Sequence, residues 1–243
     1  MLSKNNVFII SIEGNIGSGK STFLESLKQN KKYIYVREPV DEWETIVDGN
    51  GKTMLEKFYA DQEKYSFSFQ IMAFISRLGL LKRTIEKAII DRKNPTEPIY
   101  IITERSLYTD KYVFCNMLFD NGKIEDVNYL IYIKWFEEFT QDYPLHKIIY
   151  IKTDPEICHE RIAKRARQGE SVIPLEYLKE CDKYHESMLE IIKNTDVTIY
   201  TIDGNKKPEE LYTNKILCNF IEDTPIEKTV FNWSGCVEGC IGY

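Results

Sequence analysis

Glycines, a lysine and a serine gather near the start of the chain, in the stretch Gly14-Asn15-Ile16-Gly17-Ser18-Gly19-Lys20-Ser21-Thr22. Its GxxxxGK[ST] spacing is typical of a loop whose backbone N–H groups surround phosphate oxygens. Lys20 would supply a positive charge, and the Ser21 hydroxyl would bind Mg²⁺. A chance glycine-rich turn is the alternative, but an apolar strand pattern precedes the loop and a helical pattern follows it. The stretch therefore predicts binding of a nucleotide together with Mg²⁺, without deciding the reaction, since switches, motors and kinases share this loop.

A second chemical group follows another apolar run, at Glu104-Arg105-Ser106. It places a carboxylate suited to a metal ion beside a guanidinium suited to the charge on a phosphoryl group in transfer. GTP-binding switches instead carry an apolar strand ending in Asp-x-x-Gly and an Asn-Lys-x-Asp motif. Lys152-Thr153-Asp154-Pro155 is at most distantly similar to the second of these. The pattern therefore favours phosphoryl transfer over a switch.

Glu38 ends a third apolar run and is followed by Pro39, which stops a regular strand. A carboxylate at that place could accept the proton of a hydroxyl that attacks the γ-phosphoryl group. Alternatively, Glu38 forms only a salt bridge, for example with Arg37 or Arg105. Because the phosphate loop and Glu104-Arg105-Ser106 accompany it, we favour the role of general base.

Four cations recur at helical spacing further along the chain: Arg161, Lys164, Arg165 and Arg167. Such a run is most often a solvated helix face. In a phosphoryl-transfer enzyme it is also typical of a lid that closes over the triphosphate and excludes water. We favour the Arg-rich lid, because the run follows a predicted strand on the same edge of the sheet as the phosphate loop.

The stretch from Tyr65 to Lys87 has the period of an amphipathic helix. Gln70, Ala73 and Arg77 lie along one border of its apolar stripe. A side-chain amide there could pair with the edge of a nucleobase, Arg77 could add charge, and the small Ala73 would leave room for the ring. Alternatively, Gln70 and Arg77 merely mark where the stripe meets solvent, which the periodicity alone favours. Trp43, Tyr59 and Phe69 are aromatic candidates for stacking on a base, or for the core.

The elements that must position these groups alternate along the chain. Five runs read as strands: Val7 to Ile12, Tyr33 to Val36, Ile99 to Thr103, Lys147 to Ile151 and Val197 to Ile202. Strands alternating with helices predict an α/β fold with a five-stranded parallel sheet flanked by helices. Such sheets bind ligands at the carboxyl ends of their strands. The phosphate loop, Glu38 and Arg105 all follow strand ends, so we expect them at one edge.

The composition limits the binding partners and the cellular compartment that we expect for the protein. The 243 residues are 43% hydrophobic and carry a net charge of −6, without a basic run that could follow a nucleic acid backbone. No apolar stretch reaches the length of a membrane helix, and no leader pattern precedes Val7. The six cysteines are spread through the chain, which favours reduced thiols. We expect a single cytoplasmic domain spanning 1–243, with no nucleic acid or membrane partner.

The ordered motifs resemble the deoxynucleoside kinase family, in the branch of deoxycytidine and deoxyguanosine kinases. The resemblance extends to about residue 220, and 221–243 is an extension of uncertain role. Five segments carry it: Gly14 to Thr22, Glu38-Pro39-Val40 with Trp43, Ser66-Phe67-Ser68-Phe69-Gln70 through Arg77, Glu104-Arg105-Ser106 through Asp110, and Ile173 to Leu178. It implies a P-loop kinase fold and transfer of the ATP γ-phosphoryl group to the 5′-hydroxyl of a deoxyribonucleoside, in nucleotide salvage.

The resemblance also implies a role for each matching position. Glu38 corresponds to the general base, Arg105 to the transition-state and substrate clamp, and Gln70 to the residue that reads the base. The other implied groups are Trp43 and Phe69 around the base, Tyr59 and Glu170 at the 3′-hydroxyl, Ser21 and Glu104 at the magnesium ion, and Arg161, Arg165 and Arg167 at the phosphates. Ala73, Arg77 and Asp110 resemble the branch that accepts deoxycytidine and purine deoxynucleosides rather than thymidine. The family also implies a homodimer packed through helices.

Two departures and two rival functions accompany this interpretation. Gly169 stands where relatives often have an acidic residue, and Cys236 and Cys240 lack enough partners for a zinc site. His146, His159 and His185 show no metal-ligand pattern, so we expect structural or surface roles.

A thymidylate-type monophosphate kinase is one rival, which Glu104-Arg105-Ser106 disfavours. A catalytically silent nucleotide-binding protein is the other, although it would not need Glu38.

Overall fold

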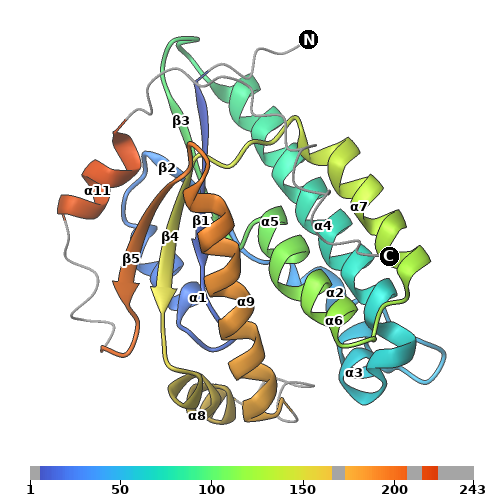
Figure 1. Cartoon of the computed structure of the whole chain (residues 1–243). Helices are drawn as coiled ribbons and strands as arrows, with labels where there is room; N and C mark the ends of the chain where they lie inside the picture. Colours follow the sequence, from blue (N-terminus) through green and yellow to red (C-terminus); the bar gives the residue numbers. More distant parts are fainter. Residues whose placement is uncertain (1–5, 166–172, 207–214, 224–243) are drawn as a thin grey trace.

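The computed structural model describes residues 6–165, 173–206 and 215–223 (Figure 1). A five-stranded parallel sheet lies at its centre, in the order β2-β3-β1-β4-β5. The strands are β1 Val7–Glu13, β2 Tyr33–Val36, β3 Ile99–Glu104, β4 Lys147–Lys152 and β5 Thr198–Asp203. Each lies within about one residue of the run predicted from the sequence, so the α/β fold with a parallel sheet is confirmed.

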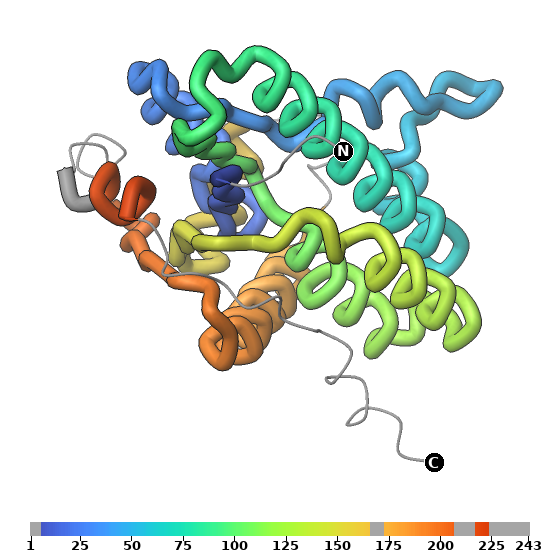
Figure 2. The backbone as a smooth tube through the Cα atoms, turned by 90° about the horizontal axis from the view of Figure 1, so that it is seen from above, coloured from blue at the N-terminus to red at the C-terminus, as the bar shows by residue number. Residues whose placement is uncertain are grey.

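Helices connect the strands and flank both faces of the sheet (Figures 1 and 2). They are α1 Lys20–Leu27, α2 Val40–Glu44, α3 Met54–Ala60, α4 Gln62–Asp91, α5 Leu107–Thr109, the π-helix η1 Asp110–Cys115, α6 Asn116–Asp120, α7 Asp126–Thr140, α8 Pro155–Arg165, α9 Leu175–Lys193 and α11 Lys215–Glu222. None of these described helices is long and apolar enough to pass through a membrane.

Helix α4 extends beyond the predicted Tyr65 to Lys87 at both ends. Its early start has a local cause, because the Asp61 side chain caps it by accepting a hydrogen bond from the Lys64 backbone N–H at 3.2 Å. The capping aspartate lies outside the apolar period that predicted the helix. Periodicity therefore located α4, but the cap fixed where it begins.

Alternate residues of the strands face two separate cores. Ile10 and Ile12 of β1 pack on the side of α1 and α11, with Phe23 and Leu217. Ile9 points to the opposite core, to which α4, α5, α7 and α9 contribute. Figure 2 shows α4 and α7 on the side of the sheet away from α11. Because helices bury both faces, the inner strands are almost entirely apolar.

Neighbouring strands bring the chemical groups to one edge. In the β1–β3 register Ile12 pairs with Glu104, and in the β2–β3 register Val36 pairs with Thr103. The three strands β2, β3 and β1 therefore end side by side, so the segments that follow them emerge next to one another. This is the carboxyl edge at which parallel sheets bind ligands.

Candidate active site

The phosphate loop joins β1 to α1 in a conformation that requires glycine. Gly14 has a φ of 143°, and a Cβ there would lie 2.5 Å from the Ile151 carbonyl oxygen. Gly17 has a φ of 79°, and its Cβ would lie 2.6 Å from the Cys158 carbonyl oxygen. Since neither neighbour is a movable side-chain end, both glycines let the loop curl tightly in front of the first turn of α1.

Lys20 opens α1 and folds back onto its own loop. Its Nζ donates to the carbonyl oxygens of Gly14 at 3.0 Å and Asn15 at 2.7 Å. Burial, aided by the positive charge of Arg105, lowers the pKa of Lys20 to about 7. Phosphate oxygens, being charged acceptors, would bind this ammonium more strongly than neutral carbonyls do.

The next residue connects α1 to the end of β3. The Ser21 hydroxyl donates to Glu104 Oε1 at 2.6 Å. A hydroxyl and a carboxylate are the hard oxygen ligands that Mg²⁺ prefers, and this ion usually keeps several waters and binds substrate phosphates as well. The described residues hold no cluster of three or more His, Cys, Asp and Glu ligands. The donor set thus fits a magnesium ion shared with a nucleotide, and not a site made by protein alone.

Glu38 lies where two guanidinium groups meet. Its Oε1 accepts from Arg77 Nη2 at 2.9 Å and lies 3.3 Å from Arg105 Nε. Burial alone would raise the pKa of Glu38, but Arg105, Arg77 and Lys20 outweigh it and lower this pKa to about 2. Glu38 is therefore ionised at neutral pH. Of the two salt-bridge partners that the sequence suggested for Glu38, Arg105 is observed, whereas Arg37 pairs with Glu25 instead.

Arg105 has an unusual backbone for a side chain of its size, with a φ of 64°. Such a conformation costs free energy and persists only where surrounding contacts enforce it. Its backbone N–H donates to the Ile12 carbonyl at 3.0 Å, and its Nη1 donates to the Gly14 carbonyl at 3.1 Å. Its guanidinium also lies 4.9 Å from the centre of the Phe114 ring. Arg105 thus ties β1, the phosphate loop and η1 together.

Arg77 and Asp110 form a buried pair between α4 and η1. Arg77 Nε donates to Asp110 Oδ2 at 2.8 Å, and its Nη2 reaches Oδ1 at 3.2 Å. Burial raises the pKa of the Asp110 carboxyl to about 6, although the contact with Arg77 opposes the rise. Arg77 also donates to the Glu104 carbonyl at 2.9 Å. A single guanidinium therefore joins Asp110 to Glu38.

Several aromatic side chains line the same cavity as these charged residues. Phe58 stacks on Phe69 with centroids 4.5 Å apart, and Phe69 meets Trp43 edge-on at 5.7 Å. The Trp43 indole N–H donates to Ser76 Oγ at 2.7 Å. Gln70 lies on the same helix as Phe69 and is 1% exposed, and its Oε1 is one of the buried oxygens without a hydrogen bond among the described residues.

Charged and aromatic groups line one cavity of about 510 Å³. The predicted site residues that line it are Ile16, Gly17, Gly19, Lys20, Ser21, Thr22, Glu38, Trp43, Tyr59, Phe69, Gln70, Ala73, Arg77, Glu104, Arg105, Asp110, Arg161 and Arg165. Gly14, Asn15 and Ser18 of the phosphate loop are buried and do not line the cavity, and the Asn15 amide donates to the Leu178 carbonyl. Arg167 and Glu170 lie outside the described residues.

The border position predicted for Gln70, Ala73 and Arg77 needs correction. None of the three meets solvent, because α2 and η1 cover that side of α4 and bury all of them. The distinction between border and core is a tertiary one, which helical period does not contain. The covering helices also turn this side of α4 into a wall of the cavity.

Sequence reasoning missed several lining residues. Phe114 of η1 and Phe58 of α3 line the cavity, as does Tyr177 at the start of α9. Phe114 lies four residues after Asp110, a spacing that could have suggested a shared helix face. Phe58 precedes the candidate Tyr59, and Tyr177 lies within the quoted segment Ile173 to Leu178, but their residue types carry no chemical signal of their own. Their contribution depends on folding contacts that periodicity does not show.

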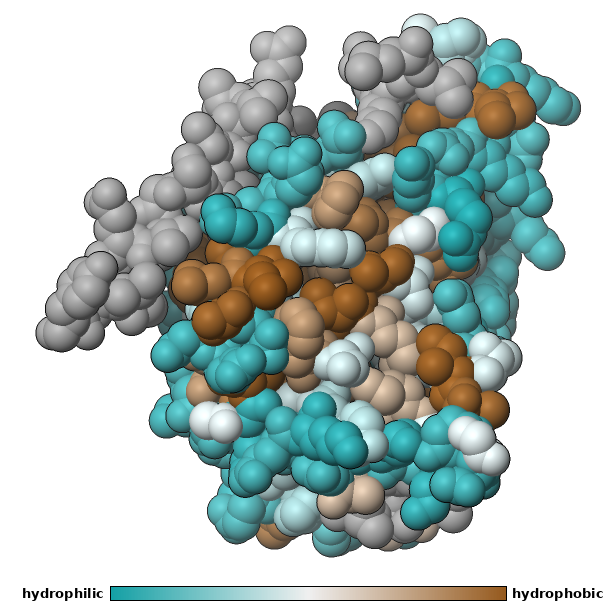
Figure 3. All heavy atoms as spheres, turned by 90° about the vertical axis from the view of Figure 1, so that its right-hand side faces the viewer, coloured by the Kyte–Doolittle hydropathy of each residue, from teal (hydrophilic) through white to brown (hydrophobic). Residues whose placement is uncertain are grey.

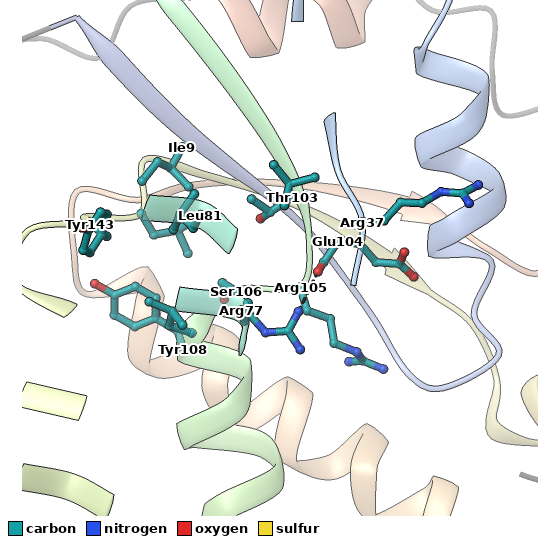
Figure 4. Close-up of a pocket in the computed structure, with 13 residues that line it drawn as sticks. Ile9, Arg37, Arg77, Leu81, Thr103, Glu104, Arg105, Ser106, Tyr108 and Tyr143 are labelled. Carbon is teal, nitrogen blue, oxygen red and sulfur yellow. Dashed lines mark hydrogen bonds between the residues drawn. The ribbon is translucent and has the colours of Figure 1, made fainter. Parts of the chain in front are cut away.

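A smaller cavity of about 20 Å³ lies behind the charged groups. In Figure 4 the apolar side chains of Ile9, Leu81 and Tyr108 gather on one side of it, and the guanidinium groups of Arg77 and Arg105 extend away from them. A space of this volume has room for about one water molecule. It is too small for a nucleoside, so the larger cavity is the candidate substrate site.

The amino-acid sequence of the chain matches known proteins. Residues 10–222 match the family described as deoxynucleoside kinase. The chain belongs to the deoxynucleoside kinase family. This deoxynucleoside kinase is an ATP-dependent enzyme of nucleotide salvage. The family assignment sets aside the rival monophosphate kinase and the catalytically silent protein.

Three relatives illustrate the similarity. The deoxynucleoside kinase is 39% identical over 183 residues to "Probable deoxycytidine kinase" of Fowlpox virus (strain NVSL), covering 74% of this chain and 71% of the relative. It is 34% identical over 231 residues to deoxycytidine kinase of Homo sapiens, covering 85% and 87%. It is 30% identical over 204 residues to mitochondrial deoxyguanosine kinase of Xenopus laevis, covering 78% and 75%.

Proposed function

We propose that this deoxynucleoside kinase prefers deoxycytidine and purine deoxynucleosides to thymidine, and that Glu38 and Arg105 carry out the transfer to the 5′-hydroxyl. One observation carries the proposal: Glu38 Oε1 lies between Arg77 and Arg105, on a cavity that Lys20 also lines. A sugar hydroxyl beside Glu38 would face a γ-phosphoryl group held by the loop. The printed names of the relatives support the substrate class.

Glu38 is proposed to take the proton as the hydroxyl attacks. Its low pKa keeps the carboxylate ionised and able to orient the hydroxyl by accepting its hydrogen bond. The hydroxyl proton becomes acidic only as its oxygen bonds to phosphorus, so a weak base suffices at that stage. Arg105 is proposed to stabilise the charge that develops on the transferring group.

The nucleotide is proposed to bind along the opposite part of the cavity. The phosphate loop from Gly14 to Thr22 would surround the phosphates, and Ser21 and Glu104 would hold Mg²⁺, which would neutralise charge on the β- and γ-phosphates. Arg161 and Arg165 line the cavity near the loop, and the Arg161 Nη1 donates to the Ser18 carbonyl at 3.3 Å. With Arg167, they are proposed to act as the lid.

The nucleoside base is proposed to lie between the aromatic group and α4. Trp43 and Phe69 would enclose the ring, and the buried Gln70 amide would pair with its edge. The Arg77–Asp110 pair would place charged groups near an exocyclic amine, whereas thymine has a carbonyl and a methyl group there. Tyr59 and Glu170 are proposed at the 3′-hydroxyl.

A phosphorylation panel tests the substrate proposal. The four deoxynucleosides, their ribose counterparts and thymidine monophosphate would each be incubated with ATP and Mg²⁺, and kcat/KM would be measured. We expect the highest values for deoxycytidine or a purine deoxynucleoside. Thymidine as the best substrate would contradict the preference, and thymidine monophosphate as the best substrate would contradict the acceptor.

We also infer a homodimer and one domain spanning 1–243. Exposed apolar side chains form a stripe along α7 and continue onto α4, and Figure 3 shows hydrophobic side chains gathered on this face. The stripe, called here the α7 patch, consists of Val127, Leu130, Ile131, Trp135 and Phe139 with Ile75. A patch of this kind is typical of a protein interface.

A cytoplasmic location remains part of the proposal, supported by the unpaired cysteines of the described residues.

A further inference from the structure

Arg105 is held by contacts on several sides, and one of them comes from the middle of α9, beyond the first turn of that helix, which contributes to the site. Glu38, Gly14 and Phe114 hold its Nε, its Nη1 and the face of its guanidinium. On α9, the Nε2 of His185 lies 3.5 Å from Arg105 Nη1. His185 has none of its surface exposed, so its ring atoms must find partners inside the protein.

The hydrogen bonds of His185 determine which nitrogen carries its proton. Its Nδ1 lies 2.6 Å from the Cys181 carbonyl oxygen, which can only accept, so Nδ1 carries the hydrogen. In a neutral ring Nε2 then has a lone pair and can only accept. An arginine can only donate, so the Nη1 of Arg105 and the Nε2 of His185 are complementary.

The surroundings favour this neutral form. Burial, aided by the positive charge of Arg105, lowers the pKa of His185 to about 3. A protonated ring would instead place two donors and two positive charges face to face. Tyr150 stacks on the imidazole at 6.4 Å, and Phe114 meets it edge-on at 6.3 Å. Since Phe114 also packs on Arg105, the ring and the guanidinium are held in one aromatic enclosure.

We propose that His185 is a positioning residue that orients Arg105 for phosphoryl transfer, by accepting a hydrogen bond at Nε2 while the Cys181 carbonyl fixes the ring. Arg105 needs such support because its backbone is strained, and because a misplaced guanidinium would lose contact with Glu38 or with the transferring group. The inference rests on the role proposed above for Arg105. It extends the site to the middle of α9, the helix whose first turn binds Asn15 of the phosphate loop.

Two near-isosteric variants separate positioning from a purely structural role. In His185→Gln an amide oxygen can occupy the place of Nε2, whereas the bond to Cys181 is lost. In His185→Asn an amide N–H can occupy the place of Nδ1, whereas the contact with Arg105 is lost. We expect His185→Asn to lower kcat by about 10- to 100-fold, and His185→Gln to lose clearly less. The dissociation constants for ATP and deoxycytidine should stay within about threefold of wild type in both.

Ile192→Ala provides a control for stability. Ile192 is buried on α9 two turns beyond His185 and does not line the cavity, so its truncation should lower Tm and leave kcat unchanged at a temperature well below Tm. Positioning is overturned if His185→Asn equals or exceeds His185→Gln in kcat, or if both remain within about twofold of wild type. It is also overturned if each loss of kcat merely follows the loss of Tm seen with Ile192→Ala.

The Arg105→Lys variant distinguishes failure of this inference from failure of the proposed function. If Arg105→Lys alone keeps wild-type kcat, the role of Arg105 is wrong. If it loses activity but His185→Asn does not, only the positioning role is wrong. In the Arg105→Lys background, His185→Asn should cost less than about twofold, because the oriented group is already gone. Fully additive losses would contradict the coupling, even where the single His185 variants fold poorly.

Discussion

Glu38 keeps its charge far into the acid range because two guanidinium groups meet at one of its oxygens. If it is the general base, Glu38→Gln should lower kcat by at least about 10²-fold while the protein stays folded. The measurement is steady-state kinetics with deoxycytidine, and circular dichroism checks the fold. Undiminished turnover in Glu38→Gln or Glu38→Ala would refute the base role.

The same carboxylate makes a testable contribution to stability against pH. The pKa of Glu38 is lowered from 4.5 to about 2 in the folded protein. Because the folded state then binds the proton less tightly than the unfolded chain, the charge stabilises the fold above about pH 4.5, and this stabilisation is lost as pH falls towards 2. The difference in free energy of unfolding between wild type and Glu38→Gln should therefore shrink between pH 6 and pH 3. Urea titrations at several pH values would measure it, and a constant difference would contradict the shifted pKa.

The Arg77–Asp110 pair should decide between bases. The double variant, Arg77→Met with Asp110→Ala, removes both members of the buried ion pair. Neither of the two charges is then left without the other. We expect the ratio of kcat/KM for thymidine to that for deoxycytidine to rise at least about tenfold. The four-nucleoside panel measures it, and unchanged relative rates would count against the assignment.

Asp110→Ala alone is the informative comparison for this double variant. It leaves the Arg77 guanidinium buried with Glu38 and the Glu104 carbonyl as its remaining partners. We expect it to lose more stability than the double variant, because a buried guanidinium that has lost one of its two carboxylate partners is costlier than a site from which both members of the pair are gone.

At the scale of elements, α2 and α4 are joined by the bond from the Trp43 indole to Ser76 Oγ. Ser76 also donates to the Met72 carbonyl at 2.7 Å, so its hydroxyl both donates and accepts. Ser76→Ala would leave the buried indole N–H unsatisfied and should cost about 1–3 kcal/mol in the free energy of unfolding. Urea denaturation measures the loss. Trp43→Phe added to Ser76→Ala should restore part of it, and strictly additive losses would show that the two side chains are not coupled.

Elements of the fold differ in how far the sequence predicts them. The strands and the phosphate loop follow from local patterns, because apolar runs of strand length and the glycine spacing of the loop carry signals of their own. The start of α4 depended on the Asp61 cap, and η1 has no periodic signature that distinguishes a π-helix from an α-helix. Sequence patterns could identify Glu38 and Arg105 as candidates. They could not show that the two side chains contact each other, or that Arg77 bridges Asp110 to Glu38, because these contacts depend on strand order and helix packing.

At the scale of the whole molecule, the α7 patch should control oligomeric state. A charge at its centre, as in Leu130→Glu with Ile131→Glu, would have to be desolvated in an interface. We expect sedimentation velocity to show a dimer for wild type and a monomer for this variant at the same concentration. Leu130 and Ile131 are exposed and are not among the residues that line the cavity, so the fold should remain intact by circular dichroism.

Val47→Glu is the matched control for this experiment. Val47 is another exposed apolar side chain, but it lies outside the α7 patch. Its replacement should leave sedimentation unchanged. A wild-type monomer, or a dimer that persists in the Leu130→Glu and Ile131→Glu variant, would contradict the proposed interface.

The charged groups around Glu38 offset each other in number: the cations Lys20, Arg77 and Arg105 accompany the carboxylates Glu38, Glu104 and Asp110. The other charged residues of the cavity wall, Arg37, Asp41, Arg161 and Arg165, give the cavity as a whole an excess of positive charge. An uncharged nucleoside beside Glu38 thus binds next to side chains whose charges nearly cancel. The nucleotide instead carries several negative charges, which the proposed Mg²⁺ ion and lid arginines would have to neutralise. Dissolved ions screen the attraction between charged groups. Because ATP is charged and the deoxynucleoside is not, added KCl should weaken ATP binding and leave deoxynucleoside binding almost unaffected. The enzyme would then keep its affinity for the deoxynucleoside at ionic strengths that change its affinity for ATP.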